Sequence, residues 1–233
     1  MRNSAAPQLQ QNRILRDLPE EEYRRIADHI EPVNLPHGKI IYEVDQPIDY
    51  AYFPFRAMVS LVTLMEDGKI VEVGLVGRDG MTGFVGLMGQ KTSPDRAIVQ
   101  IPDGGVRVRF EVIKEEFERS ESLQRSLLRY GYTLMRQISQ TAACNATHSA
   151  EERLSRWLLM CQDRVQSDDL NLTQEFIAEM LGTRRATVNV AASNLQSAGL
   201  ISYNRGQIRI NDRKGMIAFS CECYEALNKA ISA

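Results

Sequence analysis

Two adjacent arginines and a threonine stand near the start of a predicted helix in the C-terminal half of the chain. Arg184, Arg185 and Thr187 follow a glycine, Gly182, in a segment with the sequence LTQEFIAEMLGTRRATVNVAASNLQSAGLI. Guanidinium groups bind phosphates and the acceptor edge of guanine, and hydroxyl groups bind phosphates. A helix dipole disfavours cations at the helix N-terminus, so an ordinary core hairpin gains no stability from these arginines. The pattern therefore indicates a nucleic-acid ligand.

The residues around the two arginines predict a helix-turn-helix. A first amphipathic helix is expected to end at Gly182, where a left-handed backbone costs least. Thr183 is then expected to cap a recognition helix over 183–197, whose first turns would face the DNA major groove. The expected buried face of that helix comprises Val188, Ala191 and Leu195.

A β-hairpin is predicted directly after this helix. Two short alternating runs flank Asn204-Arg205-Gly206, a turn sequence, so the hairpin would form a wing with Arg205 at its tip. The whole chain carries a net charge of −2, whereas this region is rich in cations. Affinity for nucleic acid would therefore reside in a local patch. Its cations are Arg184, Arg185, Arg205, Arg209, Arg213 and Lys214.

Composition indicates an ordinary globular protein. Of 233 residues, 43% are hydrophobic and 25% charged, and no apolar run approaches the roughly 20 residues that span a membrane. The first residues, MRNSAAPQLQQNR, lack an apolar signal core, so we expect a cytoplasmic protein that does not contact membranes. Residues 1–12 are expected to form a disordered tail.

The cysteines do not predict a metal centre. None of them forms a CxxC pair, so we expect reduced thiols and no zinc or iron–sulfur framework. The cysteines are Cys144, Cys161, Cys221 and Cys223. The close pair Cys221 and Cys223 leaves a redox role as a hypothesis. No haem ligand is indicated by His29, His37 or His148, and no cofactor is predicted.

The two halves of the chain differ in periodicity. Short strand-like runs between turn residues, from about 33 to 110, predict an antiparallel β-roll of the jelly-roll or cupin-like kind. A long helix follows over 120–147, and Ser149 is expected to cap the next helix. The predicted class is α+β, with a disordered tail at 1–12, a β-roll at 13–119, the long helix at 120–147 and a winged helix-turn-helix at 148–233.

The long helix carries apolar residues at coiled-coil spacing, which favours a two-fold homodimer over a helix that only covers its own β domain. The expected dimerisation residues are Leu123, Leu127, Tyr130, Leu134, Ile138 and Thr141.

This order of elements resembles the Crp/Fnr family of bacterial transcription regulators over about residues 13–215. The segment 150–159, AEERLSRWLL, is similar to the family's helix that enters the DNA-binding domain. The resemblance implies a β-roll that senses a small-molecule effector, a homodimer on a palindromic double-stranded DNA site, and contact with RNA polymerase.

Departures from the family pattern affect the effector. Members that bind cyclic nucleotides have a Gly-Glu-Leu-type loop, and Phe84 stands here in place of the glutamate. A phenyl ring cannot accept hydrogen bonds from a ribose, so tight binding of cAMP in the usual mode is not expected. Iron–sulfur members use N-terminal cysteines, which are absent before Cys144. The residues matching the effector pocket are Gly83, Phe84, Leu87 and Arg96.

The recognition helix also departs from the family's Arg-Glu-Thr pattern with a second arginine one turn later. Ala186 and Val190 replace the glutamate and the second arginine. The family's first arginine matches Arg185, so the resemblance implies guanine binding there. From the chemistry of their side chains we expect a thymine methyl contact by Ala186 and adenine binding by Asn189. Phosphate contacts are expected from Thr173, Arg184, Thr187 and Arg205.

Two other functions were weighed. A cupin-like enzyme would need clustered metal ligands, but His37 is the only histidine among the strand-like runs of about 33–110, and no nucleophile–base pair or P-loop stands out. A ligand-independent interaction module, in which the β domain only supports dimerisation, remains open.

Overall fold

The computed structural model describes residues 11–232, and their side chains as far as 229. The described residues fall into two compact units, one comprising residues up to 61 together with 75–132, the other 62–74 together with 133 onward. In chain order the elements are α2 (Arg13–Arg16), α3 (Glu20–Ala27), β1 (Glu31–Leu35), β2 (Ile40–Tyr42), β3 (Tyr50–Pro54), β4 (Met58–Leu64), β5 (Ile70–Val76), η1 (Phe84–Met88), β6 (Arg96–Ile101), β7 (Asp103–Arg109), α4 (Phe110–Arg119), α5 (Glu121–Thr147), α6 (Ala150–Val165), β8 (Asp169–Asn171), α7 (Gln174–Met180), α8 (Arg185–Ser197), β9 (Ile201–Asn204), β10 (Gln207–Ile210), α9 (Arg213–Phe219) and α10 (Cys223–Ser232).

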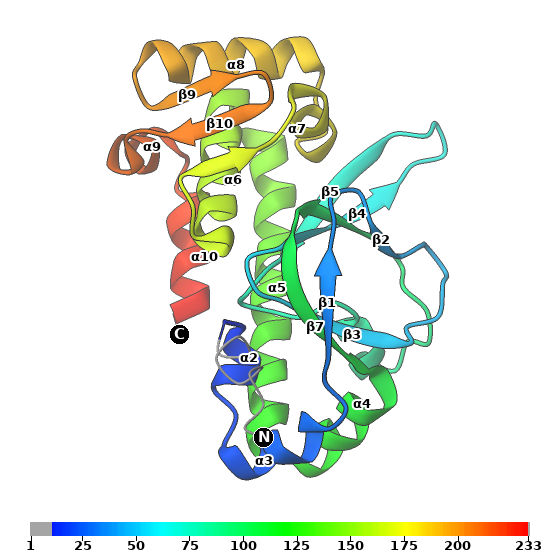
Figure 1. The fold of residues 1–233 in the computed structure, drawn as a ribbon. Coiled ribbons are helices and arrows are strands. Elements are labelled where there is room, and N and C mark those ends of the chain that lie inside the picture. Colours follow the sequence, from blue (N-terminus) through cyan, green and yellow to red (C-terminus); the bar gives the residue numbers. More distant parts are fainter. Residues whose placement is uncertain (1–10, 233) are drawn as a thin grey trace. The chain divides into compact units, whose positions relative to one another are not determined.

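The N-terminal half forms the predicted antiparallel β structure. One sheet has the order β1-β7-β3, with both neighbours of β7 antiparallel to it, and a second has the order β2-β6-β4-β5 (Figure 1). Phe53 of β3 and Val106 and Val108 of the neighbouring strand β7 are almost fully buried. The α+β class and the β-roll order predicted from the alternating runs are therefore confirmed.

The predicted disordered tail ends earlier than expected. Residues 1–10 lie outside the described residues, but Asn12 has no exposed surface. Its amide nitrogen donates to the carbonyl oxygens of Pro54 (3.0 Å) and Gly80 (2.9 Å), and its side-chain oxygen accepts from the backbone N–H of Ile14. The prediction was wrong at Asn12 because the tertiary partners of a polar side chain cannot be seen in local sequence.

The long helix α5 is present, but its faces were assigned incorrectly. Leu123 and Leu127 have no exposed surface in the single chain, and the Tyr130 hydroxyl donates to Met81 O at 2.9 Å. These residues belong to the chain's own core and cannot form a dimer seam. The large apolar side chains that α5 exposes are Leu128, Tyr132, Met135 and Ile138. Of the predicted dimerisation set, Leu134 is also buried, whereas Ile138 and Thr141 keep exposed surface.

A glycine in α5 is explained by a close approach. Phe84 packs edge-on against Tyr130, with ring centroids 5.7 Å apart. A Cβ atom at Gly131 would lie 2.1 Å from Cζ of Phe84, closer than any non-bonded contact allows. Phe84 is thus held by the helix, and Gly131 makes room for it.

The second unit contains the C-terminal helices and a small sheet of order β8-β10-β9. Ser149 caps α6 in a capping box with Glu152, as predicted. Trp157 of α6 is buried and donates from Nε1 to Glu72 at 2.8 Å. Strand β8 was not among the elements predicted from the sequence. Among the described helices, none has the length and apolar character needed to cross a membrane.

Candidate nucleic-acid interface

The turn between α7 and α8 has the predicted geometry. Gly182 adopts a left-handed φ of 57°. Its N–H donates to Glu179 O at 3.1 Å, and the N–H of Thr183 donates to Ala178 O at 2.9 Å. These two hydrogen bonds form a Schellman motif, which satisfies the last carbonyls of α7. The helix-turn-helix inferred from Gly182 is confirmed.

The start of α8 differs from the prediction. Thr183 does not occupy the cap position, because it belongs to the turn that ends α7, where its N–H donates to Ala178 O. Arg184 occupies the N-cap position with an extended backbone, and the helix begins at Arg185 rather than at 183. No side chain caps α8. The N–H groups of its first turn thus lack a side-chain acceptor, and such groups at a helix N-terminus favour an anion.

Helix α8 has one buried and one exposed face. Val188, Ala191 and Leu195 are buried as predicted, together with Ala192. Asn194 attaches the helix to α6 by donating to Glu151 at 3.0 Å. On the other face the exposed residues include Arg185, Ala186, Asn189 and Val190, and Val190 is 57% exposed. Thr187 is half-buried.

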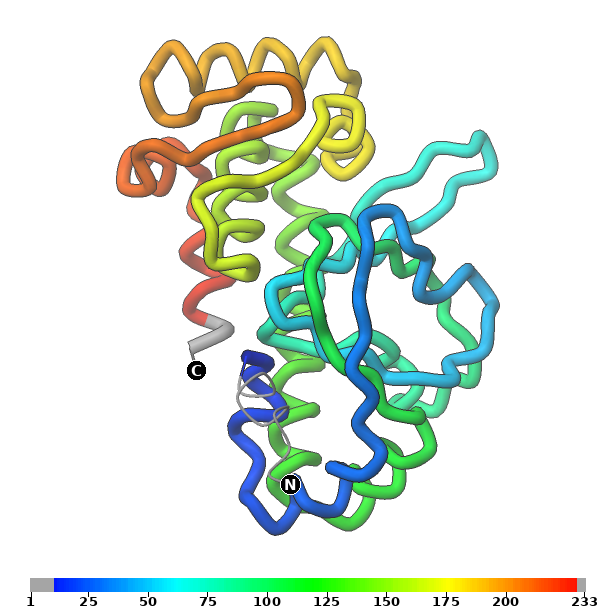
Figure 2. The backbone as a smooth tube through the Cα atoms, in the orientation of Figure 1, coloured from blue at the N-terminus to red at the C-terminus, as the bar shows by residue number. Residues whose placement is uncertain are grey.

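The predicted wing is formed by β9 and β10, which lie beside α8 (Figure 2). Its two-residue turn is Arg205-Gly206, with φ values of 46° and 82°. Positive φ at both positions defines a type I′ turn. The turn is attached to the start of α7, because the N–H of Leu172 donates to Gly206 O at 2.7 Å and the Tyr203 hydroxyl donates to Leu172 O at 3.0 Å.

Three predicted contact residues from different elements line one shallow hollow. Thr173 precedes α7, Arg185 opens α8 and Arg205 lies in the wing turn. The complete lining is Thr173, Gln174, Glu175, Arg185, Tyr203, Arg205 and Gly206. Burial raises the pKa of Tyr203, while the positive charge of Arg185 opposes this rise. Tyr203 therefore lines the hollow as a neutral phenol.

Sequence analysis missed two aspects of this surface. Gln174 donates from Nε2 to Asn189 Oδ1 at 3.1 Å and so orients the Asn189 amide. Thr173 caps α7 by accepting from the N–H of Phe176 at 3.3 Å, which leaves its own O–H available as a donor. The capping role could have been inferred from its place before the helix, whereas the Gln174 contact depends on how α7 and α8 pack.

The cationic patch is smaller than its sequence suggested. Arg209 forms an ion pair with Asp169 at 3.2 Å, and Arg213 forms one with Asp163 at 2.6 Å. In the part of the chain that the structure describes, Arg184, Arg185 and Arg205 form no ion pair. Their guanidinium groups are exposed at the start of α8 and in the wing turn, so they are the cations there that can bind a nucleic acid.

The predicted effector residues have partners within their own unit. Gly83 has a φ of 81° and precedes η1, Phe84 is buried against Tyr130, and Leu87 is half-buried. Arg96 donates from Nε to Glu43 at 2.8 Å. An effector pocket at these residues stays a prediction.

Comparisons with known proteins agree with this geometry. Residues 152–219 match the family model of the Crp-like helix-turn-helix domain. The transcriptional regulatory protein btr of Bordetella pertussis is 28% identical over 85% of each chain. The CRP-like cAMP-activated global transcriptional regulator of Mycobacterium tuberculosis is 22% identical over 80% of this chain and 87% of its own length. The structure of FixK2 from Bradyrhizobium japonicum shares the fold, with a TM-score of 0.71 and 19% identity, over 82% of this chain and 98% of that one.

Proposed function

Because this chain is a transcription regulator of the Crp/Fnr type with a helix-turn-helix DNA-binding domain, we propose that it binds a palindromic DNA site as a homodimer, with α8 in the major groove. One observation carries the proposal: Arg184, Arg185 and Arg205 are exposed at the start of α8 and in the wing, and none of them forms an ion pair within the described residues. A recognition helix and a wing that carry cations can contact one duplex together.

Phosphate contacts position the protein on this site. Arg184 and the uncapped N–H groups of α8 favour one phosphate, and Thr187 in the first turn supplies a hydroxyl. Arg205 and the free O–H of Thr173 serve a second phosphate, since both line the hollow beside the wing. These contacts bind DNA of any sequence.

Base recognition comes from the exposed face of α8. Arg185 binds the O6 and N7 acceptors of a guanine, and Asn189, oriented by Gln174, binds an adenine edge. Ala186 and the exposed side chain of Val190 contact thymine methyl groups. The family pattern has a glutamate and an arginine at these two positions. Because both are apolar here, we expect the half-site of this protein to differ from the family's usual half-site.

A second copy of the chain covers α5. Leu128, Tyr132, Met135 and Ile138 are spaced three or four residues apart and stay exposed in one chain. Such a stripe fits a two-helix coiled coil. We propose this seam in place of the one predicted from the sequence, because Leu123, Leu127, Tyr130 and Leu134 are buried in the single chain.

Regulation on DNA further involves RNA polymerase and a small-molecule effector, in the cytoplasm. The relative from Mycobacterium tuberculosis is named as cAMP-activated. In this chain Phe84 cannot accept a ribose hydrogen bond, so the effector binds in another mode. Arg96, which the family resemblance groups with Gly83, Phe84 and Leu87, pairs with Glu43 and is the cation that we propose for an anionic effector.

Selection of binding sites from random DNA tests the proposal. We expect a palindromic site, and Arg185→Ala should weaken binding to it by about 1–3 kcal/mol while relaxing one base pair in each half-site. Arg184→Ala is the matched control, because it should weaken binding to selected and random DNA equally. A loss caused by Arg185→Ala that is equal on both kinds of DNA contradicts the proposed base contact.

A further inference from the structure

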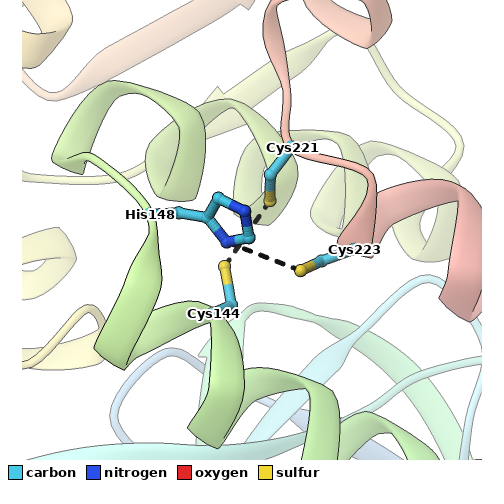
Figure 3. Close-up of side chains that lie close together, drawn as sticks. All are labelled: Cys144, His148, Cys221 and Cys223. Atoms are coloured by element: carbon cyan, nitrogen blue, oxygen red, sulfur yellow. Dashed lines mark hydrogen bonds between the residues drawn. The ribbon is translucent and has the colours of Figure 1, made fainter.

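Four side chains far apart in the sequence meet in the second unit (Figure 3). Cys144 lies in the last turn of α5, and His148 follows that helix. Cys221 lies between α9 and α10, and Cys223 opens α10. The Sγ atoms of Cys144 and Cys221 are 3.5 Å apart, and Sγ of Cys223 lies 3.7 Å from Nδ1 of His148.

The spacing of these atoms fits one metal ion. The four ligand atoms all lie within 4.8 Å of one another. Zinc binds sulfur at about 2.3 Å and nitrogen at about 2.0–2.1 Å, which places two tetrahedral sulfur ligands about 3.8 Å apart and a sulfur about 3.6 Å from the nitrogen. The measured separations of 3.5 Å between two sulfur atoms and 3.7 Å between sulfur and nitrogen are close to these values. An iron–sulfur cluster holds several atoms between its cysteines and would require a wider cage.

The chemistry of the cluster is that of a structural zinc site. Three thiols with one imidazole form a Cys₃His set, in which four protein ligands close the coordination sphere. The three cysteines are at most 4% exposed and form a small buried cluster of their own. Their burial keeps water away from the thiols, as a closed structural site requires.

The surroundings of the cluster supply an independent observation. While Nδ1 of His148 faces the sulfur atoms, its Nε2 lies 3.2 Å from a carboxylate oxygen of Glu222. Histidines that bind metals almost always donate their second ring N–H to such a group, which fixes the ring. Gln140 also donates to Sγ of Cys223 at 3.0 Å. A donor to one thiol and an acceptor behind the imidazole are the neighbours expected around a bound metal.

We propose that Cys144, His148, Cys221 and Cys223 bind one zinc ion. The ion joins the end of α5 to the segment between α9 and α10. Because 72 residues separate His148 from Cys221, closing this loop restricts the unfolded chain and stabilises the second unit.

Metal analysis of the full-length reduced protein, expressed with added zinc, tests this site. We expect about one zinc ion per chain in the wild type. Cys161→Ser is the matched control, since Cys161 is buried in α6 outside the cluster and should not change the zinc content. Cys221→Ser and Cys223→Ser should each lose the zinc.

A second measurement covers variants that fail to fold. Cobalt(II) added to the zinc-free wild type should give the visible absorption of a tetrahedral ion and a sulfur-to-metal charge-transfer band at an equimolar end point. A lowered melting temperature after removal of zinc from the wild type would support the stabilising role. The proposal would be overturned if the wild type took up no zinc and gave no cobalt spectrum, or if Cys144 and Cys221 formed a disulfide in place of a metal site. Retention of zinc by Cys221→Ser would also overturn it.

Discussion

Replacing Arg205 with asparagine is expected to flatten the salt dependence of DNA binding while leaving the wing folded. Arg205 has a φ of 46° in a type I′ turn before Gly206. Asn-Gly is a preferred sequence for this turn, whereas alanine would be strained there. Arg205→Asn therefore removes the charge and keeps the backbone, which circular dichroism can verify.

The magnitude follows from the release of counterions. Each phosphate contact contributes about −0.9 to the slope of log K against log salt concentration. A dimer loses two such contacts, so the slope should become shallower by about 1.8. Between about 50 and 200 mM salt, the advantage of the wild type over Arg205→Asn should then shrink by roughly 12-fold.

Fluorescence anisotropy titrations over this salt range, with cognate and random duplexes, provide the measurement. Arg209→Gln is the matched control, because it removes the same charge from the same hairpin, but Arg209 is already paired with Asp169. Its slope should equal that of the wild type. Equal flattening by both variants would show that the overall field of the wing, rather than a contact by Arg205, governs binding, and would refute the reasoning.

Two further predictions concern the long helix. Met135→Glu places an unpaired charge in the proposed coiled-coil seam and should weaken dimerisation by at least about tenfold, measured by sedimentation equilibrium. The neighbouring Arg136→Glu is the control and should leave dimerisation unchanged, and a stable dimer of Met135→Glu would exclude this seam. Gly131→Ala places a Cβ atom 2.1 Å from the ring of Phe84 and should lower the free energy of unfolding by about 1–3 kcal/mol in chemical denaturation. Gly104→Ala is the control, because the atom nearest to its added Cβ would be 3.8 Å away. Equal stability of the two variants would contradict the packing argument.

Local patterns predicted the elements that local physics determines. Gly182 ends α7 and Asn204-Arg205-Gly206 turns the wing, because the backbone conformation at each site depends on one or two residues. The class of fold followed from the change of hydrophobic period. Strand β8 was missed because three residues carry too little periodicity to separate a strand from a loop.

Features that depend on tertiary packing could not be predicted. Helix α5 carries two apolar stripes of similar period, and only the structure shows that Leu123 and Leu127 face the core while Leu128 and Met135 do not. The cysteine cluster joins a Cys-x₃-His pair to a Cys-x-Cys pair far along the chain. Neither pair alone has the spacing of a known zinc motif, so the donor set emerges only when the helices pack.

The attachment of the wing turn to the start of α7 has an evolutionary consequence. The hydrogen bond from Leu172 to Gly206 O fixes the distance between Thr173 and Arg205 through the backbone, independently of the side chains on α8. Ala186 and Val190 are exposed and bear no part of the buried face. In the proposed mode of binding, substitutions at these two positions should therefore change the preferred operator at little cost in stability, and we expect gene duplicates of such a regulator to acquire separate target genes by this route.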